Sequence, residues 1–299
     1  MTISLIIPAL NATAELPRLI AALAAQTILD FETILVDDGS SDNTAELAAA
    51  AGWRVIKMPQ NRGPATCRNA GVAAAKGEIL VFTDADCRPE PNWMALLARA
   101  IEDKGTAAVM GRVRIETSNI FGQAVSALGF PAGGSTGFEK IWPVDSKGLT
   151  VSLSTCNCAV KRSALQSAGG FDTGFPYAGG EDSLLAYRLI RKGDKILFCP
   201  EAVVWHPARD RWSDFVRWQF KRGMSAYIFS TRVDRQGDFV SLRLWSTINI
   251  IKTWSKHWLF PLIMILLVAS AGIQAAGFFW KRCRLRNRKM DSQDASFRA

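Results

Sequence analysis

The stretch Ile79-Leu80-Val81-Phe82-Thr83-Asp84-Ala85-Asp86 carries the strongest structural signal in this chain. Its apolar first half predicts a strand that is buried on both faces, as in a parallel sheet. Two carboxylates, one residue apart, follow directly after that strand. Such a pair can hold a hard divalent ion, Mg²⁺ or Mn²⁺, whose other ligands come from substrate phosphates. A solvated turn explains an isolated Asp-x-Asp equally well. The rest of the chain decides between a metal site and a solvated turn.

The segments around this stretch alternate between strand and helix patterns. The predicted strands cover residues 3–8, 31–36, 54–58 and 78–83, and the predicted helices cover residues 12–26, 42–51 and 65–75. This alternation predicts an α/β fold with a mostly parallel, twisted sheet flanked by helices. Ligands bind such sheets at the carboxyl ends of the strands. Polar clusters follow three of these strands, at residues 8–11, 37–41 and 84–86, and their expected convergence favours the metal interpretation.

The second half of the chain is less regular. A strand is expected near residues 155–160, and the glycine-rich residues 129–137 predict a loop. A glycine pair precedes Glu181 and Asp182, which stand before a helical pattern at residues 183–192. Carboxylates at the start of a helix can be simple caps that the helix dipole favours. A catalytic role is the alternative.

Composition narrows the class of protein. The chain has 299 residues, is 48% hydrophobic and has a net charge of +9. Much of the positive charge lies in residues 281–289, directly after an apolar segment, which favours an anchor at a membrane surface over a solvated tail. Since no recognition motif accompanies it, we expect no nucleic-acid partner. The six cysteines have no zinc-site spacing and indicate free thiols in a reducing compartment.

Two C-terminal segments predict contact with lipid. Residues 259–280 carry no formal charge, are long enough to cross a bilayer and are flanked by Trp258 and Trp280. Residues 231–258 place Trp245 and Trp254 among basic side chains, as in a helix lying in the interface. A buried helix of a soluble domain is the alternative for residues 259–280. Because the N-terminus predicts a first strand and not a signal peptide, we expect a shallow or hairpin-like association with both ends cytoplasmic.

Five motifs, in order along residues 2–225, resemble those of glycosyltransferase family 2, which has the GT-A fold. The first motif, residues 3–11, is the opening strand with its polar end. The second, residues 34–42, is a nucleotide-base segment, and the third, residues 61–71, is a loop and helix. The fourth, residues 82–86, is the metal motif, and the fifth, residues 169–172 with 180–182, is an acceptor-side signature. The resemblance implies a catalytic domain over residues 1–230. The hydropathy and charge patterns predict an amphipathic region over 231–258, a transmembrane or re-entrant segment over 259–280 and a basic tail over 281–299.

The resemblance also implies roles for particular residues. Asp182, with Glu181 beside it, would serve as the catalytic base. Asp86 would be the main metal ligand, shared with Asp84 and completed by His206, although a lone histidine is more often structural. The cofactor would be Mn²⁺ or Mg²⁺. The residues expected to bind the nucleotide sugar are Pro8, Asn11, Asp38, Arg68 and Asp84.

The implied activity is an inverting transfer of a single sugar. The donor would be a nucleotide-diphosphate sugar, with a UDP-sugar expected, and the acceptor a lipid-linked saccharide or a lipid in cell-envelope or polysaccharide biosynthesis. The protein would lie on the inner or plasma membrane with its catalytic domain in the cytoplasm and would contact membrane lipids. Leu10 stands where many members carry an aromatic residue, so stacking on the nucleotide base would be weaker here. The chain also lacks the Gln-x-x-Arg-Trp motif of processive synthases, which favours transfer of a single sugar.

Elementary chemistry supports these roles. Displacement at an anomeric carbon needs an acceptor hydroxyl that loses its proton to a nearby carboxylate. A divalent ion stabilises the departing diphosphate. A nucleotidyltransferase of similar α/β layout is one alternative, disfavoured because no glycine-rich phosphate loop follows the first strand. A non-catalytic sugar-nucleotide-binding protein is the other, and Asp84, Asp86 and Asp182 argue against it.

Overall fold

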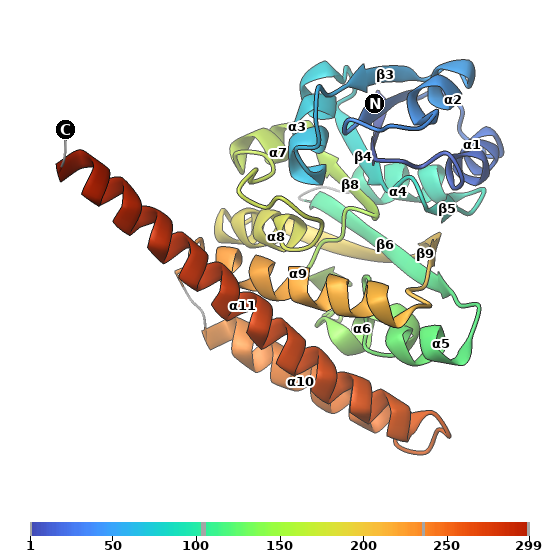
Figure 1. Cartoon of the computed structure of the whole chain (residues 1–299). Helices are drawn as coiled ribbons and strands as arrows, with labels where there is room; N and C mark the ends of the chain where they lie inside the picture. The colour runs from blue at the N-terminus through green and yellow to red at the C-terminus, as the bar shows by residue number, and fades with distance from the viewer. Residues whose placement is uncertain (1, 103–105, 235–236, 298–299) are drawn as a thin grey trace.

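One mixed sheet runs through the protein, and helices cover both of its faces (Figure 1). The structure is a computed structural model that describes residues 2–102, 106–234 and 237–297, and the side chains of residues 2–102, 106–234 and 240–285. The described strands pair in the order β3-β2-β1-β4-β8-β6-β9-β5, with β7 on β9. Their bounds are β1 Ile3–Ala9, β2 Glu32–Asp37, β3 Arg54–Lys57, β4 Ile79–Thr83, β5 Arg88–Pro89, β6 Thr106–Glu116, β7 Leu149–Thr150, β8 Asn157–Lys161 and β9 Lys195–Pro207.

The helices connect these strands and then form a C-terminal layer. Their bounds are α1 Leu16–Ala24, α2 Thr44–Ala50, α3 Pro64–Ala74, α4 Trp93–Glu102, α5 Ile120–Ser126, α6 Phe138–Ile141, α7 Arg162–Ser167, α8 Glu181–Arg191, α9 Trp212–Ser230, α10 Gly237–Trp254 and α11 Phe260–Phe297. A 3₁₀ turn, Gly134–Thr136, lies within the glycine-rich segment that was predicted to be a loop. The predicted α/β architecture is confirmed, and the predicted N-terminal elements agree with the observed ones to within a few residues.

The first four strands form the parallel part of the sheet. β1 lies between β2 and β4, and β2 also pairs with β3, all in parallel register. Every residue of β4 is buried, as its apolar run predicted. Helix α3 packs closely on β1 because Gly71 has no side chain; a Cβ there would overlap Ile6. This close packing holds the carboxyl ends of β1, β2 and β4 at one edge of the sheet.

Antiparallel strands extend the sheet beyond β4. β8 pairs antiparallel with β4, so that Thr83 faces Asn157. The Thr83 hydroxyl donates a hydrogen bond of 3.0 Å to the carbonyl oxygen of Cys156. The sequence predicted a mostly parallel sheet; in the structure, β8 is antiparallel to both neighbours, while β6 and β9 are parallel to each other. This inserted strand brings residues 154–156 beside the carboxylates that follow β4.

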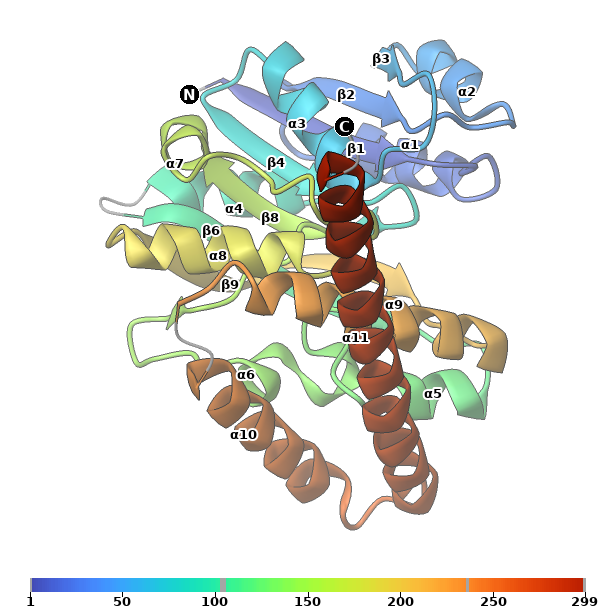
Figure 2. The same ribbon diagram turned by 60° about the vertical axis from the view of Figure 1, so that its left-hand side comes forward.

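Helix α11 packs along α9 over much of its length (Figures 1 and 2). The two backbones touch at glycines: a Cβ at Gly277 would overlap the carbonyl oxygen of Phe220, and one at Gly223 would overlap that of Gln274. In addition, the Gln274 amide donates a hydrogen bond of 2.7 Å to the side-chain oxygen of Gln219. Close backbone approach at small residues is typical of tightly packed helix pairs. Helix α11 is therefore part of the folded domain and not a loosely attached appendage.

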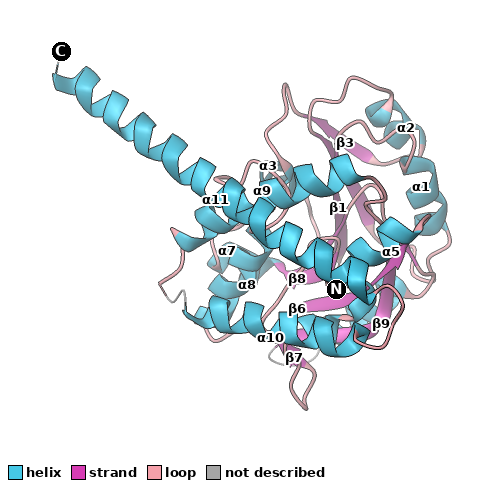
Figure 3. Cartoon of the chain, turned by 60° about the horizontal axis from the view of Figure 1, so that its bottom comes forward, coloured by secondary structure: helices cyan, strands magenta, loops and turns pink. Residues whose placement is uncertain are grey.

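The predicted lipid-contacting segments correspond to α10 and α11. Of the described residues, one helix is long and apolar enough to cross a membrane, Phe260–Leu285, with a mean hydropathy of 2.2 and 22% of its most apolar window buried. Its outward face is apolar: Ile265 is 63% exposed and Val268 is 70% exposed. The helix continues across the predicted boundary at residue 280 (Figure 3). Of the predicted basic tail, side chains from residue 286 onward lie outside the described residues.

Candidate functional site

Three predicted metal ligands meet at the carboxyl end of β4. Asp84 and Asp86 follow β4, and His206 comes from the end of β9. Their ligand atoms and the thiol of Cys87 all lie within 4.8 Å of one another. The Nε2 atom of His206 is 3.8 Å from Oδ1 of Asp86. The structure thus brings His206 beside Asp84 and Asp86, as the sequence predicted, although His206 is more than a hundred positions away.

The chemistry of this cluster suits a hard divalent ion. The Nδ1 atom of His206 lies 2.8 Å from the carbonyl oxygen of Pro207, which can only accept a hydrogen bond. Nδ1 therefore carries a proton in this contact, which leaves Nε2, on the side of Asp86, as the ring atom that could bind a metal. Burial raises the pKa of the Cys87 thiol well above its ordinary value, which favours the neutral thiol over the thiolate. Two carboxylates and an imidazole are donors that Mn²⁺ and Mg²⁺ accept.

Arg68 connects the two halves of the site. It lies on α3, is 1% exposed, and donates hydrogen bonds of 2.8 Å to Oδ1 of Asp84 and of 2.8 Å to Oε1 of Glu181. Burial alone would lower the pKa of Arg68, but the charges of Asp84 and Glu181 raise it. The sequence predicted that Arg68 binds the nucleotide or a phosphate. In the structure its guanidinium holds one carboxylate from the metal cluster and one from the start of α8.

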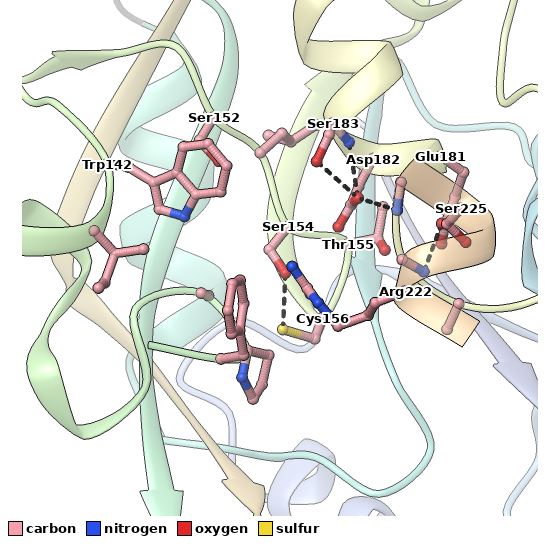
Figure 4. Close-up of a pocket in the computed structure, with 18 of the residues that line it drawn as sticks. Trp142, Ser152, Ser154, Thr155, Cys156, Glu181, Asp182, Ser183, Arg222 and Ser225 are labelled. Carbon is pink, nitrogen blue, oxygen red and sulfur yellow. Dashed lines mark hydrogen bonds between the residues drawn. The ribbon is translucent and has the colours of Figure 1, made fainter. Parts of the chain in front are cut away.

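Glu181 and Asp182 have different surroundings, although they are neighbours. Glu181 is 1% exposed, binds Arg68 and accepts a hydrogen bond of 2.8 Å from the backbone N–H of Gly179. Burial, and then the charge of Asp182, raises the pKa of Glu181 to about 7. Asp182 lines a cavity, and the hydrogen bonds it makes to described residues all reach its Oδ1 atom, from Gly180 and Ser183 (Figure 4). Asp182 is therefore the member of the pair that can reach a ligand.

Of the residues predicted to bind the nucleotide, Arg68 and Asp84 line this cavity, whereas Pro8, Asn11 and Asp38 lie at the neighbouring strand ends outside it. Pro8 is in β1, and Asn11 follows that strand with φ of 51° and accepts a hydrogen bond from the backbone N–H of Ser41. Asp38 follows β2 and is buried, and its carboxylate accepts hydrogen bonds from the backbone N–H groups of residues 62 and 63, at 2.7 and 2.9 Å. These bonds fix the loop that leads into α3 and so position Arg68. Recognition of a base by Asp38 stays a prediction.

The cavity beside Asp182 also contains residues to which the sequence gave no role. Its lining includes Phe130, Ser154 and Arg243. Arg209 and Arg222 line it as well; from the sequence, these two could screen a diphosphate or a lipid-phosphate acceptor, or could be ordinary surface charge. Figure 4 shows Ser154, Asp182 and Arg222 around the same space. Arg243 has a recognisable signal, since it is a single charge among apolar residues of α10. Phe130 has none, because only the folded glycine-rich segment brings it there.

Comparisons with known proteins agree on one family. Residues 4–168 match the model of glycosyl transferase family 2. Pre-mycofactocin glycosyltransferase of Mycobacterium tuberculosis is 27% identical over 257 residues, covering 83% of this chain and 53% of the relative. The O-antigen chain rhamnosyltransferase WbaN of Salmonella anatum is 30% identical over 208 residues, covering 68% and 65%. The chain thus spans about half the length of the first of these relatives.

Solved structures share the fold. The mannosyltransferase PcManGT from Pyrobaculum calidifontis, in complex with GDP-Man and Mn²⁺, has a TM-score of 0.58 at 19% identity, covering 90% of this chain and 75% of that one. S. aureus TarS 1-349 in complex with UDP has a TM-score of 0.56 at 16% identity, covering 94% and 91%. At these identities the likeness establishes the architecture, and a GT-A arrangement of the sheet is confirmed.

Replacement of Arg68 by Met should destabilise the protein strongly. The change leaves the carboxylate of Glu181 buried without its cation, and breaking a buried pair in this way costs about 3–5 kcal/mol. Urea unfolding followed by tryptophan fluorescence would measure the loss. Adding Glu181→Gln should restore part of the stability, because it removes the unpaired charge.

Arg188→Met provides the matched control. Arg188 also binds a carboxylate, Asp172, at 3.1 Å, but its side chain is partly exposed. Pairs of this kind contribute about 0–1 kcal/mol. Equal losses for the Arg68 and Arg188 variants, or additive losses for Arg68 and Glu181, would contradict the assigned role of Arg68.

Proposed function

Because the chain belongs to glycosyl transferase family 2, we propose that it moves a single sugar from a nucleotide-diphosphate sugar to a hydroxyl group of a saccharide or lipid-linked acceptor, with inversion at the anomeric carbon. The observation that carries this proposal is that Arg68 connects the Asp84–Asp86–His206 cluster to the Glu181–Asp182 pair. A donor clamp and a separate base are what a direct displacement requires. The family match gives no support to the nucleotidyltransferase alternative.

The reaction would proceed by one exchange of bonds. The acceptor oxygen forms a bond to the anomeric carbon while the bond from that carbon to the diphosphate oxygen breaks. Asp182 takes the proton of the acceptor hydroxyl, and the nucleoside diphosphate leaves with its negative charge. Asp84, Asp86 and His206 would hold Mn²⁺ or Mg²⁺, and that ion would offset the charge on the leaving diphosphate. Arg68 would orient Asp84, and Glu181 would fix the start of α8 on which Asp182 stands.

The identity of the donor and the cellular role are proposed from the sequence and from the names of similar proteins. A UDP-sugar is the donor that the sequence favours, and similar structures hold UDP or GDP-Man. An acceptor in cell-envelope or polysaccharide biosynthesis is supported by relatives named as O-antigen chain rhamnosyltransferases and a chondroitin synthase. Asp38, Pro8 and Asn11 are proposed to lie near the base and ribose, at the strand ends beside the metal cluster.

We also propose that α10 and α11 lie on the cytoplasmic face of a membrane, in its plane. Both helices expose apolar side chains, among them Leu244 on α10 and Val268 on α11. The opposite face of α11 packs on the catalytic domain from Leu259 to Gly277. If α11 crossed the bilayer, it would therefore draw α9 into the hydrocarbon together with the charged Arg217 that α9 carries. Each such charge would cost about 2.5–3.5 kcal/mol.

Replacement of Asp182 by Asn should abolish transfer while preserving donor binding. Loss of a general base typically lowers the rate about 10²–10⁴-fold. Transfer assays across a set of nucleotide sugars, together with calorimetry of the bound nucleotide, would separate the two effects. The exposed carboxylate of Glu201 offers a control, since Glu201→Gln should leave both quantities unchanged. Full activity of the Asp182 variant would rule out the proposed base and favour a different catalytic group.

Replacement of Asp86 by Ala should remove the dependence of donor binding on the metal. The wild-type protein should bind UDP or GDP more tightly with Mn²⁺ than with a chelator, whereas the variant should bind equally weakly in both. Titration of Mn²⁺ alone, followed by the electron paramagnetic resonance of the free ion, gives a readout that is independent of transfer. A variant that retains the wild-type response to Mn²⁺ would refute Asp86 as a ligand.

Charged substitutions on the outer face of α11 should weaken membrane binding. Ile265→Glu together with Val268→Glu should abolish flotation with vesicles that contain anionic lipid, because the carboxylates oppose burial in the interface. Leu29→Glu is the control, since Leu29 is equally exposed, at 67%, but lies in the N-terminal region. If the α11 variant floats as well as wild type, the proposed surface is wrong.

The in-plane arrangement has its own test. Cys283 is an exposed cysteine that follows the apolar part of α11. In intact bacterial cells producing the protein, a maleimide reagent that cannot cross membranes should label Cys283 only after lysis. Labelling of intact cells would demonstrate that α11 crosses the bilayer.

A further inference from the structure

Two arginines stand on one wall of the cavity beside Asp182, each against an aromatic ring. The guanidinium carbon of Arg222 is 3.6 Å from the centroid of Phe130 and 5.3 Å from that of Trp218. That of Arg209 is 4.8 Å from the centroid of Trp218. The guanidinium carbon of Arg243, on α10, is 5.7 Å from the centroid of Phe130. A cation–π contact uses the face of a guanidinium group, so the rings beside Arg209 and Arg222 do not occupy the N–H edges of these two groups.

The charge of Arg209 and Arg222 is not balanced within the part of the chain that the structure describes. No carboxylate there lies within ion-pair distance of either residue, in contrast to Arg68, Arg88 and Arg188. The Nε atom of Arg222 is shielded from solvent and has no hydrogen-bond partner among the described residues. Burial, followed by the charge of Arg243, lowers the pKa of Arg222 to about 9. A shielded, unpaired guanidinium in a cavity is expected to bind an anion.

The two arginines line the same cavity but are affected by different charges. Asp86 and Asp84 are among the charges that raise the pKa of Arg209 against its burial. The charges that affect the pKa of Arg222 are those of Arg243, Asp182 and Arg209. Figure 4 shows Arg222 and Asp182 around the same space. An anion bound by Arg222 is therefore assigned to the acceptor, which has to reach the proposed base.

A groove of about 890 Å³ continues from this cavity, beyond Asp182, between α8 and α10. The groove and the cavity share lining residues, which are Trp142, Ser152, Ser183, Phe229 and Leu242. The rest of its lining is mostly apolar and includes Val144, Val151, Ile190, Val233 and Trp245. Such a wall offers few partners for sugar hydroxyls, so it favours a hydrocarbon chain. Its α10 side carries Leu244 and Ile248, which are exposed on the surface proposed to contact lipid.

We propose that this cavity and groove bind an acceptor in which a phosphate is esterified to an apolar chain: Arg222 binds the phosphate, Arg209 and Arg243 support its charge, and the chain lies in the groove toward the membrane surface. The inference rests on the proposed function, since it names the acceptor class of the same site. The transfer itself is unchanged: a hydroxyl of a saccharide carried on that phosphate gives its proton to Asp182, and its oxygen forms the bond to the anomeric carbon as the bond from that carbon to the donor diphosphate breaks. The phosphate serves as a handle and is not consumed.

Binding of farnesyl phosphate to the full-length protein, without donor, tests this inference. Quenching of tryptophan fluorescence would report binding, since Trp142, Trp218 and Trp245 line the cavity and groove. Farnesyl phosphate should bind at least tenfold more tightly than farnesol, which lacks the phosphate, and than inorganic phosphate, which lacks the chain. Arg222→Met should weaken farnesyl phosphate about tenfold or more, because a hydrogen bond to a charged group is lost. Equal affinities for farnesyl phosphate and farnesol would overturn the proposal.

Two further variants and one further ligand keep the outcomes distinct. Arg217→Met, an exposed arginine on the same helix α9, should bind farnesyl phosphate as wild type does. Trp245→Ala should weaken farnesyl phosphate but not isopentenyl phosphate, whose chain is too short to fill the groove. Binding of UDP or GDP with Mn²⁺ should be unchanged by Arg222→Met. If Arg222→Met weakens only the nucleotide, the arginine serves the donor and the inference fails while the proposed function stands. If no nucleotide sugar is bound or transferred by wild type, the proposed function fails, whatever farnesyl phosphate does.

Discussion

The rest of the site depends on one buried cation. Arg68 holds a carboxylate from the end of β4 and another from the start of α8, two elements nearly a hundred residues apart. Without that cation, three acidic side chains, Asp84, Glu181 and Asp182, would repel one another in a poorly solvated space. The guanidinium fork also sets the direction of each carboxylate, because its N–H groups are fixed in one plane. A single side chain thus fixes the distance between the proposed donor clamp and the proposed base.

The positions of the main elements could be predicted from the sequence, because each follows from a local pattern. The apolar run before Asp84 and the polar residues after β1 and β2 were sufficient to predict the strands and the edge of the sheet at which the candidate site lies. The family resemblance also anticipated the meeting of Asp84, Asp86 and His206. Local patterns fail where pairing is between distant segments. The antiparallel insertion of β8 depends on contacts with β4 and β6 that leave no local mark.

Roles were harder to predict than positions, because a residue type states what a side chain can do and not which partner it has. Arg68 and Asp38 were both assigned to the nucleotide, yet each is bound by other parts of the protein: Arg68 by two carboxylates and Asp38 by the backbone of residues 62 and 63. From the sequence, Arg222 is one of several basic residues on and before α9 that could bind a phosphate or could be surface charge. The Phe130 ring beside it and its unpartnered Nε atom, which only the folded chain reveals, distinguish it from the others.

The contact of α9 with α11 at Gly223 and Gly277 would fix the height of the cavity above a membrane. One face of α9 lines the cavity proposed to bind the acceptor, and another packs on the helix proposed to rest on lipid. Because α9 packs directly on α11, the cavity would stay at a constant distance from the bilayer. Acceptors whose reactive group lies near the headgroups would be reached without any search, whereas those carrying long glycans would hold their growing ends too far out. Such a geometry would favour acceptors that carry few sugars, as in the early steps of glycan assembly.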